Sequence, residues 1–325
     1  MEFPLQWACW RFTARVQSEM QLSHHAGSRL AGALGRVLRE SHCTRALADD
    51  GAALCRDDEP SCGAWPLCVY GELIRSQTQT ATGKRRDVPR PLIVCPLDGG
   101  RQLYRAGELF AFDITLIGES IGRFAEVRSA LMRCGAIGVG DNFREGAGRF
   151  AIENVRALSG ARPAPLGLPD ETAQPVNWDD VAKRAAGLRG RALRVELVRP
   201  LRLLSTSGGE NNPLPLRPEN FDWMAFWLAL NRRLKDLAFF HGQSRLELPF
   251  LENGAIRVVG NDLSWWKAKR YSGTQGREID ASGLLGSFDI EGEFESLLPF
   301  LVAGEWLHVG KNTDLGDGRF HLAPL

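Results

Sequence analysis

A segment near the C-terminus, rich in glycine and cations, has the composition of an anion-binding loop. It reads Leu307-His-Val-Gly-Lys-Asn-Thr-Asp-Leu-Gly-Asp-Gly-Arg-Phe320 and is flanked by apolar, strand-like residues. Its three glycines lack side chains and can adopt positive φ, so backbone N–H groups could converge on a phosphate. Most glycine hairpins are only turns, so the rest of the chain must support the assignment. The candidate phosphate-binding residues are Gly310, Lys311, Asn312, Gly316, Gly318 and Arg319.

The pattern excludes the phosphate loop of nucleotide hydrolases. That motif has four residues between its glycines and a Ser or Thr directly after its lysine. Here five residues separate Gly304 from Gly310, and Asn312 follows Lys311. The segment also lies among strand-like residues at the end of the chain, whereas the hydrolase motif follows a first strand and precedes a helix.

A second basic segment, rich in aromatic residues, precedes the loop. It runs from Leu263 to Gly276, and the turn glycines Gly283 and Gly286 follow it. From Leu263 to Phe320 the chain resembles, in order and spacing, the C-terminal region of the CRISPR-associated RAMP-superfamily endoribonucleases. That family cuts precursor CRISPR RNA at each repeat. The cations of this segment, Lys267, Lys269 and Arg270, are candidates for RNA phosphate contacts, because they lie among aromatic residues that could stack on bases.

The resemblance implies both an activity and a substrate. We expect an endoribonuclease that binds CRISPR repeat RNA and cleaves it by 2′-hydroxyl attack, leaving a 2′,3′-cyclic phosphate without any required cofactor. One alternative is a non-catalytic RAMP-type subunit that binds crRNA inside an effector complex, with other CRISPR subunits as partners. Another is a zinc-stabilised protein-interaction domain.

Histidines near the first expected helix are the candidates for proton transfer. Such cleavage needs a base for the 2′-hydroxyl proton, an acid for the departing 5′-oxygen, and cations around the phosphorus. Histidine suits both proton roles. His24 and His25 precede this helix and are expected to be exposed, whereas His42 follows its end. All three are candidate catalytic residues, because the family resemblance places the catalytic histidine in or just beyond this helix. Their alternatives are a polar turn pair and a helix C-cap.

Two arginines of the same helix are candidates for RNA binding. Arg29 and Arg36 lie on its expected polar face. The resembling family commonly has Leu-Arg-Gly here, whereas this chain has Leu30-Ala-Gly32 with Arg29 before the leucine.

Four cysteines follow the first expected helix and could hold a structural zinc. Cys43, Cys55, Cys62 and Cys68 are separated by eleven, six and five residues. Thiolates are common zinc ligands, but no Cys-x-x-Cys pair is present, and buried free thiols are the alternative.

Hydrophobic periodicity predicts an α+β protein with two tandem ferredoxin-like (RRM-like) domains. Residues 5–20 alternate as a strand, and residues 27–40 have the 3.6-residue period of a helix. Strands, a helix, a glycine hairpin and a strand follow, and the order repeats after a Pro- and Ala-rich stretch. The predicted organisation is an N-terminal domain over 1–157, a linker over 158–190, and a C-terminal domain over 191–325 that includes the glycine-rich loop.

Composition is that of an ordinary globular protein. The 325 residues are 44% hydrophobic and 24% charged, with a net charge of +1. Only six of the 40 cations are lysines, and arginine suits bidentate phosphate contacts. Neither a signal peptide nor an apolar run long enough to span a membrane is recognisable. We therefore expect a cytoplasmic protein with no membrane partner.

Overall fold

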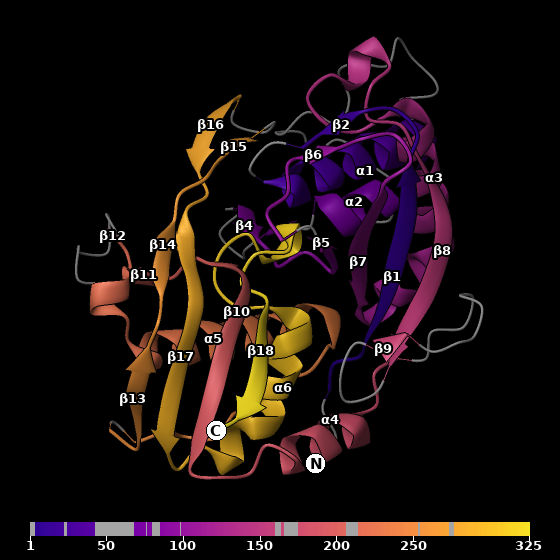
Figure 1. The fold of residues 1–325 in the computed structure, drawn as a ribbon. Helices are drawn as coiled ribbons and strands as arrows, with labels where there is room; N and C mark the ends of the chain where they lie inside the picture. Colours follow the sequence, from indigo (N-terminus) through magenta and orange to yellow (C-terminus); the bar gives the residue numbers. More distant parts are fainter. Residues whose placement is uncertain are drawn as a thin grey trace.

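The N-terminal half forms a ferredoxin-like β-α-β-β-α-β unit. The computed structural model describes residues 4–22, 25–42, 68–75, 77–79, 85–97, 99–159, 164–165, 175–205, 214–252, 254–272 and 276–325. The antiparallel strands of this half have the order β5-β7-β1-β8, with β9 at the edge (Figure 1). Its main elements are β1 (Trp7–Val16), α1 (Ala26–His42), β5 (Leu92–Pro96), β7 (Leu109–Ile117), α3 (Phe124–Ile137), β8 (Phe150–Ser159) and β9 (Ala164–Pro165).

The C-terminal half repeats this topology with strand order β13-β17-β10-β18, and β14 also pairs with β17. The predicted pair of ferredoxin-like units is confirmed. The main elements of this half are β10 (Ala192–Leu201), α5 (Trp223–His241), β13 (Ile256–Asn261), β14 (Ser264–Trp266), β17 (Gly283–Gly292), α6 (Leu298–Leu307) and β18 (Phe320–Pro324).

Shorter elements connect these units. The helices are α2 (Val69–Ile74) and α4 (Trp178–Ala186), with 3-10 turns η1 (Gly118–Arg123), η2 (Phe143–Glu145), η4 (Pro218–Asn220), η5 (Glu295–Leu297) and η6 (Thr313–Leu315). The short strands are β2 (Met20–Gln21), β3 (Gln77–Gln79), β4 (Arg85–Asp87), β6 (Leu103–Tyr104), β11 (Leu204–Ser205), β12 (Leu214–Pro215), β15 (Lys269–Ser272) and β16 (Arg277–Asp280).

Strand β1 has two different apolar faces, because successive side chains of a strand point to opposite sides. Trp10 and Phe12 are buried in a core shared with α1 and α3. Trp7 and Cys9 point the other way and belong to a second core, which they share with the C-terminal half. The N-terminal sheet is therefore covered by its own helices on one face and, at one end of the other face, by the C-terminal half.

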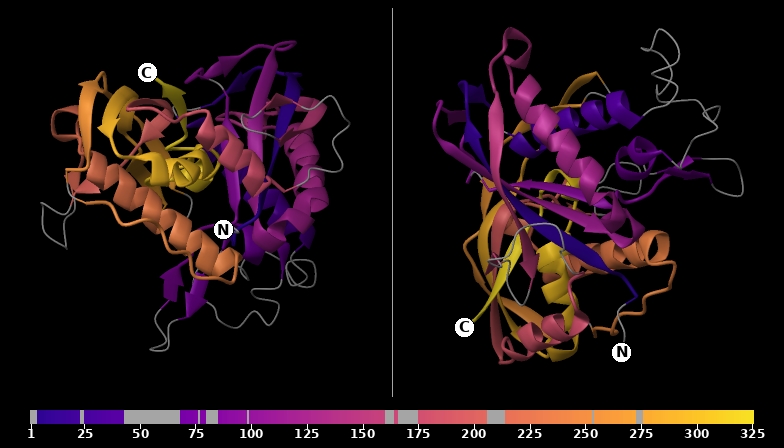
Figure 2. Two further views of the ribbon diagram at one scale, coloured as in Figure 1. Left: turned by 90° about the horizontal axis from the view of Figure 1, so that it is seen from below. Right: turned by 90° about the vertical axis from the view of Figure 1, so that its right-hand side faces the viewer.

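Helix α6 is the centre of this second core. All of its residues except Pro299 are buried, because it lies between its own sheet and the N-terminal strands (Figures 1 and 2). A helix that is apolar on every side is stable only when it is covered on every side. The glycine-rich loop starts where α6 ends, so the packing of α6 fixes the loop between the two halves.

The stretch predicted as a linker, 158–190, contains a helix. Val181 and Ala185 of α4 are buried in the second core, so this helix packs as part of the C-terminal half. Strand β8 extends to Ser159. In the described parts of the chain no helix is long and apolar enough to cross a membrane.

Candidate functional site

The glycine-rich loop packs against both α1 and β5 at the boundary between the two halves. A Cβ atom placed on Gly27 of α1 would lie 1.8 Å from the carbonyl oxygen of Leu315. Gly316 has a φ of +90°, and a Cβ on it would lie 2.8 Å from the Cα of Cys95. These approaches are possible only because neither position carries a side chain. The glycines here therefore allow close packing between the two halves, in addition to any contact with a ligand.

Acidic and basic side chains fasten the loop to the N-terminal half at three points. Asp314 pairs with Arg90, Asp317 with His25, and Arg319 with Asp113. Two of these three pairs are buried, and the Arg90–Asp314 pair is partly buried.

Arg319 is a buried structural cation. It is 5% exposed, and its Nη1 donates to Oδ2 of Asp113 at 2.9 Å. Asp113 also accepts two hydrogen bonds from Arg11, at 2.8 and 3.0 Å. A buried charge requires such partners, because transfer out of water is costly. The placement does not fit the predicted contact with RNA phosphate, so we do not assign Arg319 to RNA binding.

His25 is fully buried, and the expectation that it is exposed is wrong. Its Nδ1 accepts a hydrogen bond from the backbone N–H of Ser28 at 3.2 Å. Nε2 therefore carries the proton in the neutral ring and donates to Oδ2 of Asp317 at 2.8 Å. With both nitrogens engaged inside the protein, His25 cannot exchange a proton with RNA in this conformation.

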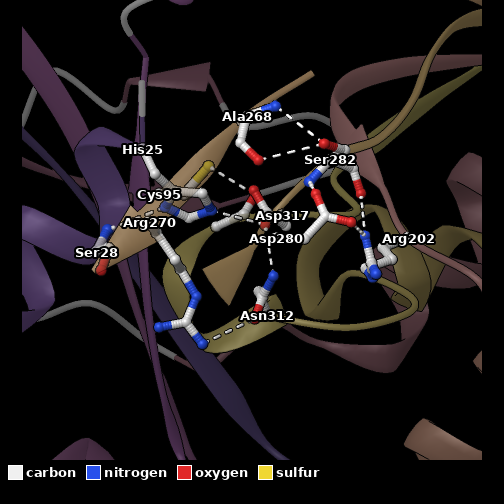
Figure 3. A network of polar contacts seen from close by, with 11 residues as sticks. His25, Ser28, Cys95, Arg202, Ala268, Arg270, Asp280, Ser282, Asn312 and Asp317 are labelled. Atoms are coloured by element: carbon white, nitrogen blue, oxygen red, sulfur yellow. Dashed lines mark hydrogen bonds and ion pairs between the residues drawn. The ribbon is translucent and has the colours of Figure 1, made fainter. Parts of the chain in front are cut away.

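The accessible part of the loop lies around Lys311, whose side chain is exposed. The next residue, Asn312, has left-handed φ and ψ and donates from Nδ2 to Oδ2 of Asp317 at 3.2 Å. Its Oδ1 accepts from Nη2 of Arg270 on β15 at 3.3 Å (Figure 3). The structure thus brings together Lys311, Asn312 and Arg270, three of the predicted RNA-binding residues.

Arg270 on β15 is half-buried. Burial lowers the pKa of its guanidinium from the ordinary value, although Asp314 and Asp317 oppose this. Its Nε is buried and has no hydrogen-bond partner in the part of the chain that the structure describes. Lys267 and Lys269 are exposed close by in sequence, and Lys269 lies 3.7 Å from Glu278 across the β15–β16 hairpin. The edge of the loop therefore has several cations that a phosphate could reach.

The two arginines of α1 contact the turn around η2. Arg29 pairs with Asp141, and the guanidinium of Arg36 lies 4.4 Å from the ring centre of Phe143. Both remain partly exposed, so RNA binding by them stays a prediction.

The two candidate histidines that the structure describes, His25 and His42, do not form one site. His42 is the last residue of α1 and is half-buried. At about 1.5 Å per residue, the 17-residue helix separates it from the His25 end by about 24 Å. His25 and His42 therefore cannot act on the same phosphate. His24 lies outside the described residues.

The cysteine cluster is only partly described. Cys68 caps α2, where its Sγ accepts a hydrogen bond from the N–H of Gly71 at 3.2 Å. Cys43, Cys55 and Cys62 lie outside the described residues, so the zinc site stays a prediction. Among the residues that are described, no group of three or more His, Cys, Asp or Glu side chains could hold a metal.

Sequence reasoning missed a buried basic cluster beneath the loop. His308 follows α6 as its C-cap, with a φ of +63°, and is 3% exposed. Burial, followed by Arg319 and Arg233, lowers the pKa of His308 well below its ordinary value. Arg233 donates from Nε to the carbonyl oxygen of Leu307 at 2.5 Å, and burial lowers its pKa to about 10. Each of these basic residues can be identified in the sequence, but their proximity depends on the packing of α5 and α6 against the loop.

Two family models match the chain. One, AF_1859_N, described as an N-terminal domain, matches residues 5–174. The other, the CRISPR-associated endoribonuclease Cas6, matches residues 195–320, which include the second ferredoxin-like unit and the glycine-rich loop. Over residues 195–320 the chain is thus of the Cas6 type. A sequence search of curated proteins finds no match.

Solved Cas6 structures share the fold over nearly the whole chain. A partial Cas6-RT-Cas1–Cas2 complex matches with a TM-score of 0.55 and 14% identity, over 99% of this chain and 46% of that one. A Thermus thermophilus Cas6 in a product complex matches with a TM-score of 0.52 and 13% identity, over 98% and 100%. The chain thus spans less than half of the first structure and the full length of the second. At these identities the likeness shows the fold.

Proposed function

We propose that this protein is a metal-independent endoribonuclease of the Cas6 type that binds CRISPR repeat RNA and cleaves it to produce mature crRNA. The observation that carries the proposal is the glycine-rich loop, held between the two halves with Lys311 exposed beside Arg270. The Cas6 family match over residues 195–320 supports the same activity. Neither catalysis nor RNA binding requires a metal in this scheme.

RNA binding is assigned to the exposed rim of the loop. Lys311 and Arg270 would contact phosphates, and the amide of Asn312 would hold Arg270 in place. Lys267 and Lys269 would extend the contact along the backbone. Duplex RNA is recognised mainly through its shape and phosphates, so we expect sequence to be read at loops or single-stranded flanks.

Cleavage is an internal transfer of phosphorus between two oxygens of the RNA. The 2′-hydroxyl gives up its proton and its oxygen attacks the adjacent phosphorus. The bond to the 5′-oxygen then breaks, and that oxygen takes a proton. The products are a 2′,3′-cyclic phosphate and a 5′-hydroxyl. A protein side chain is needed to accept the first proton and one to donate the second.

His42 is the best-placed described candidate for one of these proton transfers. Its side chain is half-buried, unlike that of the fully buried His25, and Arg39 in the same last turn adds positive charge. His24 is the alternative. The RNA would then extend from the glycine-rich loop at one end of α1 to His42 at the other, which is about 24 Å away.

The decisive test uses purified protein in EDTA with a labelled repeat RNA from its own locus. The same RNA with a 2′-deoxy nucleotide at the cleavage site is the control. We expect cleavage of the first RNA only, and its loss in His42→Ala or in His24→Ala. Full cleavage by both variants would refute the histidine assignment. Tight binding without cleavage by the wild type would support the crRNA-binding subunit instead.

A further inference from the structure

A chain of hydrogen bonds connects α1, the glycine-rich loop and β15. It begins at Nε2 of His25, 2.8 Å from Oδ2 of Asp317. The same carboxylate oxygen accepts from Nδ2 of Asn312 at 3.2 Å, and Oδ1 of Asn312 accepts from Arg270 at 3.3 Å (Figure 3). Three segments that are far apart in the sequence are thereby joined through side chains alone.

The donor and acceptor roles along this chain are mutually consistent. A guanidinium can only donate and a carboxylate can only accept. Asn312 must therefore turn its carbonyl oxygen toward Arg270 and its NH₂ group toward Asp317. Its left-handed backbone conformation is one that asparagine tolerates better than most residues. Asp317 thus fixes the amide orientation, and the amide orientation fixes the acceptor for Arg270.

Burial decreases along the chain from His25 to Arg270. His25 is 0% and Asp317 1% exposed, whereas Asn312 and Arg270 are half-buried next to the exposed Lys311. The buried end is rigid because the protein interior is closely packed around it. The other end meets solvent, because Asn312 and Arg270 are partly exposed. The rigid end can therefore determine where a guanidinium at the surface points.

We propose that His25 is a positioning residue for RNA binding: through Asp317 and Asn312 it holds Arg270 in the orientation that receives a phosphate. His25 itself transfers no proton to RNA. The inference rests on the proposed RNA-binding function and adds to it the way in which one phosphate contact is oriented.

A double-mutant cycle on RNA affinity tests the connection. The ligand is the uncleavable 2′-deoxy repeat RNA, and the variants are His25→Ala, Arg270→Ala and both together. If each single change raises Kd about tenfold, the double variant should raise it by no more than about twentyfold, because the binding free energies of coupled residues are not additive. The control pairs His25→Ala with Lys267→Ala, an exposed cation outside the hydrogen-bonded chain. For that pair the two effects should multiply.

Further variants separate positioning from stability and from catalysis. His25→Gln keeps an N–H group that can reach Asp317 and should retain affinity within about threefold. Asn312→Ala cuts the chain near the surface and should weaken RNA binding, while Tm should fall by no more than a few degrees because alanine is strained at this left-handed position. With saturating repeat RNA, the single-turnover cleavage rate of folded His25→Gln should stay within about threefold of wild type, since positioning acts on binding.

Three results would overturn the inference. One is that the effects of His25→Ala and Arg270→Ala multiply as in the control pair. Another is that Asn312→Ala binds RNA as tightly as wild type. The third is that His25→Gln binds normally but loses cleavage, which would make His25 catalytic. If the wild-type protein binds no repeat RNA, the proposed function fails as well, whereas the other outcomes leave it standing.

Discussion

Two glycines on the same helix should respond in opposite ways to the same substitution. A Cβ on Gly27 would lie 1.8 Å from the carbonyl oxygen of Leu315, whereas one on Gly32 would have nothing within 4 Å. To reach even 3.0 Å, α1 and the loop must separate by at least about 1.2 Å. Gly27→Ala should cost about 1–3 kcal/mol, as for other overpacked sites. Gly32→Ala should stabilise the protein by up to about 1 kcal/mol through helix propensity.

Denaturant unfolding followed by tryptophan fluorescence measures both variants. We expect the free energies of unfolding to differ by about 1–4 kcal/mol in favour of Gly32→Ala. Affinity for the uncleavable repeat RNA should fall only in Gly27→Ala, because only that change displaces the glycine-rich loop. Equal stability and equal RNA affinity in the two variants would show that the loop does not pack on α1 as described.

Two further predictions concern groups buried between the halves. Asp113→Asn should destabilise the protein by about 3–5 kcal/mol, because it leaves the buried Arg319 without its charged partner. Glu153→Gln breaks an exposed pair with Arg15 and should cost less than about 1 kcal/mol. Urea unfolding compares the two variants, and equal midpoints would contradict the buried Arg319–Asp113 pair. The lowered pKa of His308 means that the unfolded chain binds a proton below pH 6.5 that the folded protein does not. Stability should therefore be unaffected by this group above pH 6.5 and fall below it, by up to about 1.4 kcal/mol per pH unit. His308→Asn should reduce this loss between pH 6.5 and 5, and an unchanged pH profile would contradict the burial of His308.

The fold could be predicted because its signals are local. The alternation in β1 and the 3.6-residue period of α1 each reflect one element and its buried face. Helix α4 was missed because it follows a Pro- and Ala-rich stretch that is typical of a linker. The apolar side of α4 is buried only in the core that it shares with α6.

The site was harder to predict because it depends on long-range pairing. Nothing near His25 indicates that it is buried, since its partner Asp317 lies 292 positions away in the sequence. Arg319 and Lys311 are both cations of the glycine-rich loop, yet Arg319 is buried against Asp113 and Lys311 is exposed. Only contacts between the two halves distinguish a cation that holds the protein together from one that can meet a ligand.

The sharing of α6 between the halves has a consequence for synthesis on the ribosome. The first half is complete at the end of β8, but the face of its sheet that carries Trp7 and Cys9 is fully covered only when the C-terminal half, including α6, has emerged. About 140 residues separate these events, which at 5–20 residues per second takes about 7–28 s. During that time the nascent chain has an uncovered apolar face next to its finished first core. Slow translation or early termination before α6 should therefore favour chaperone capture or aggregation over a stable N-terminal fragment.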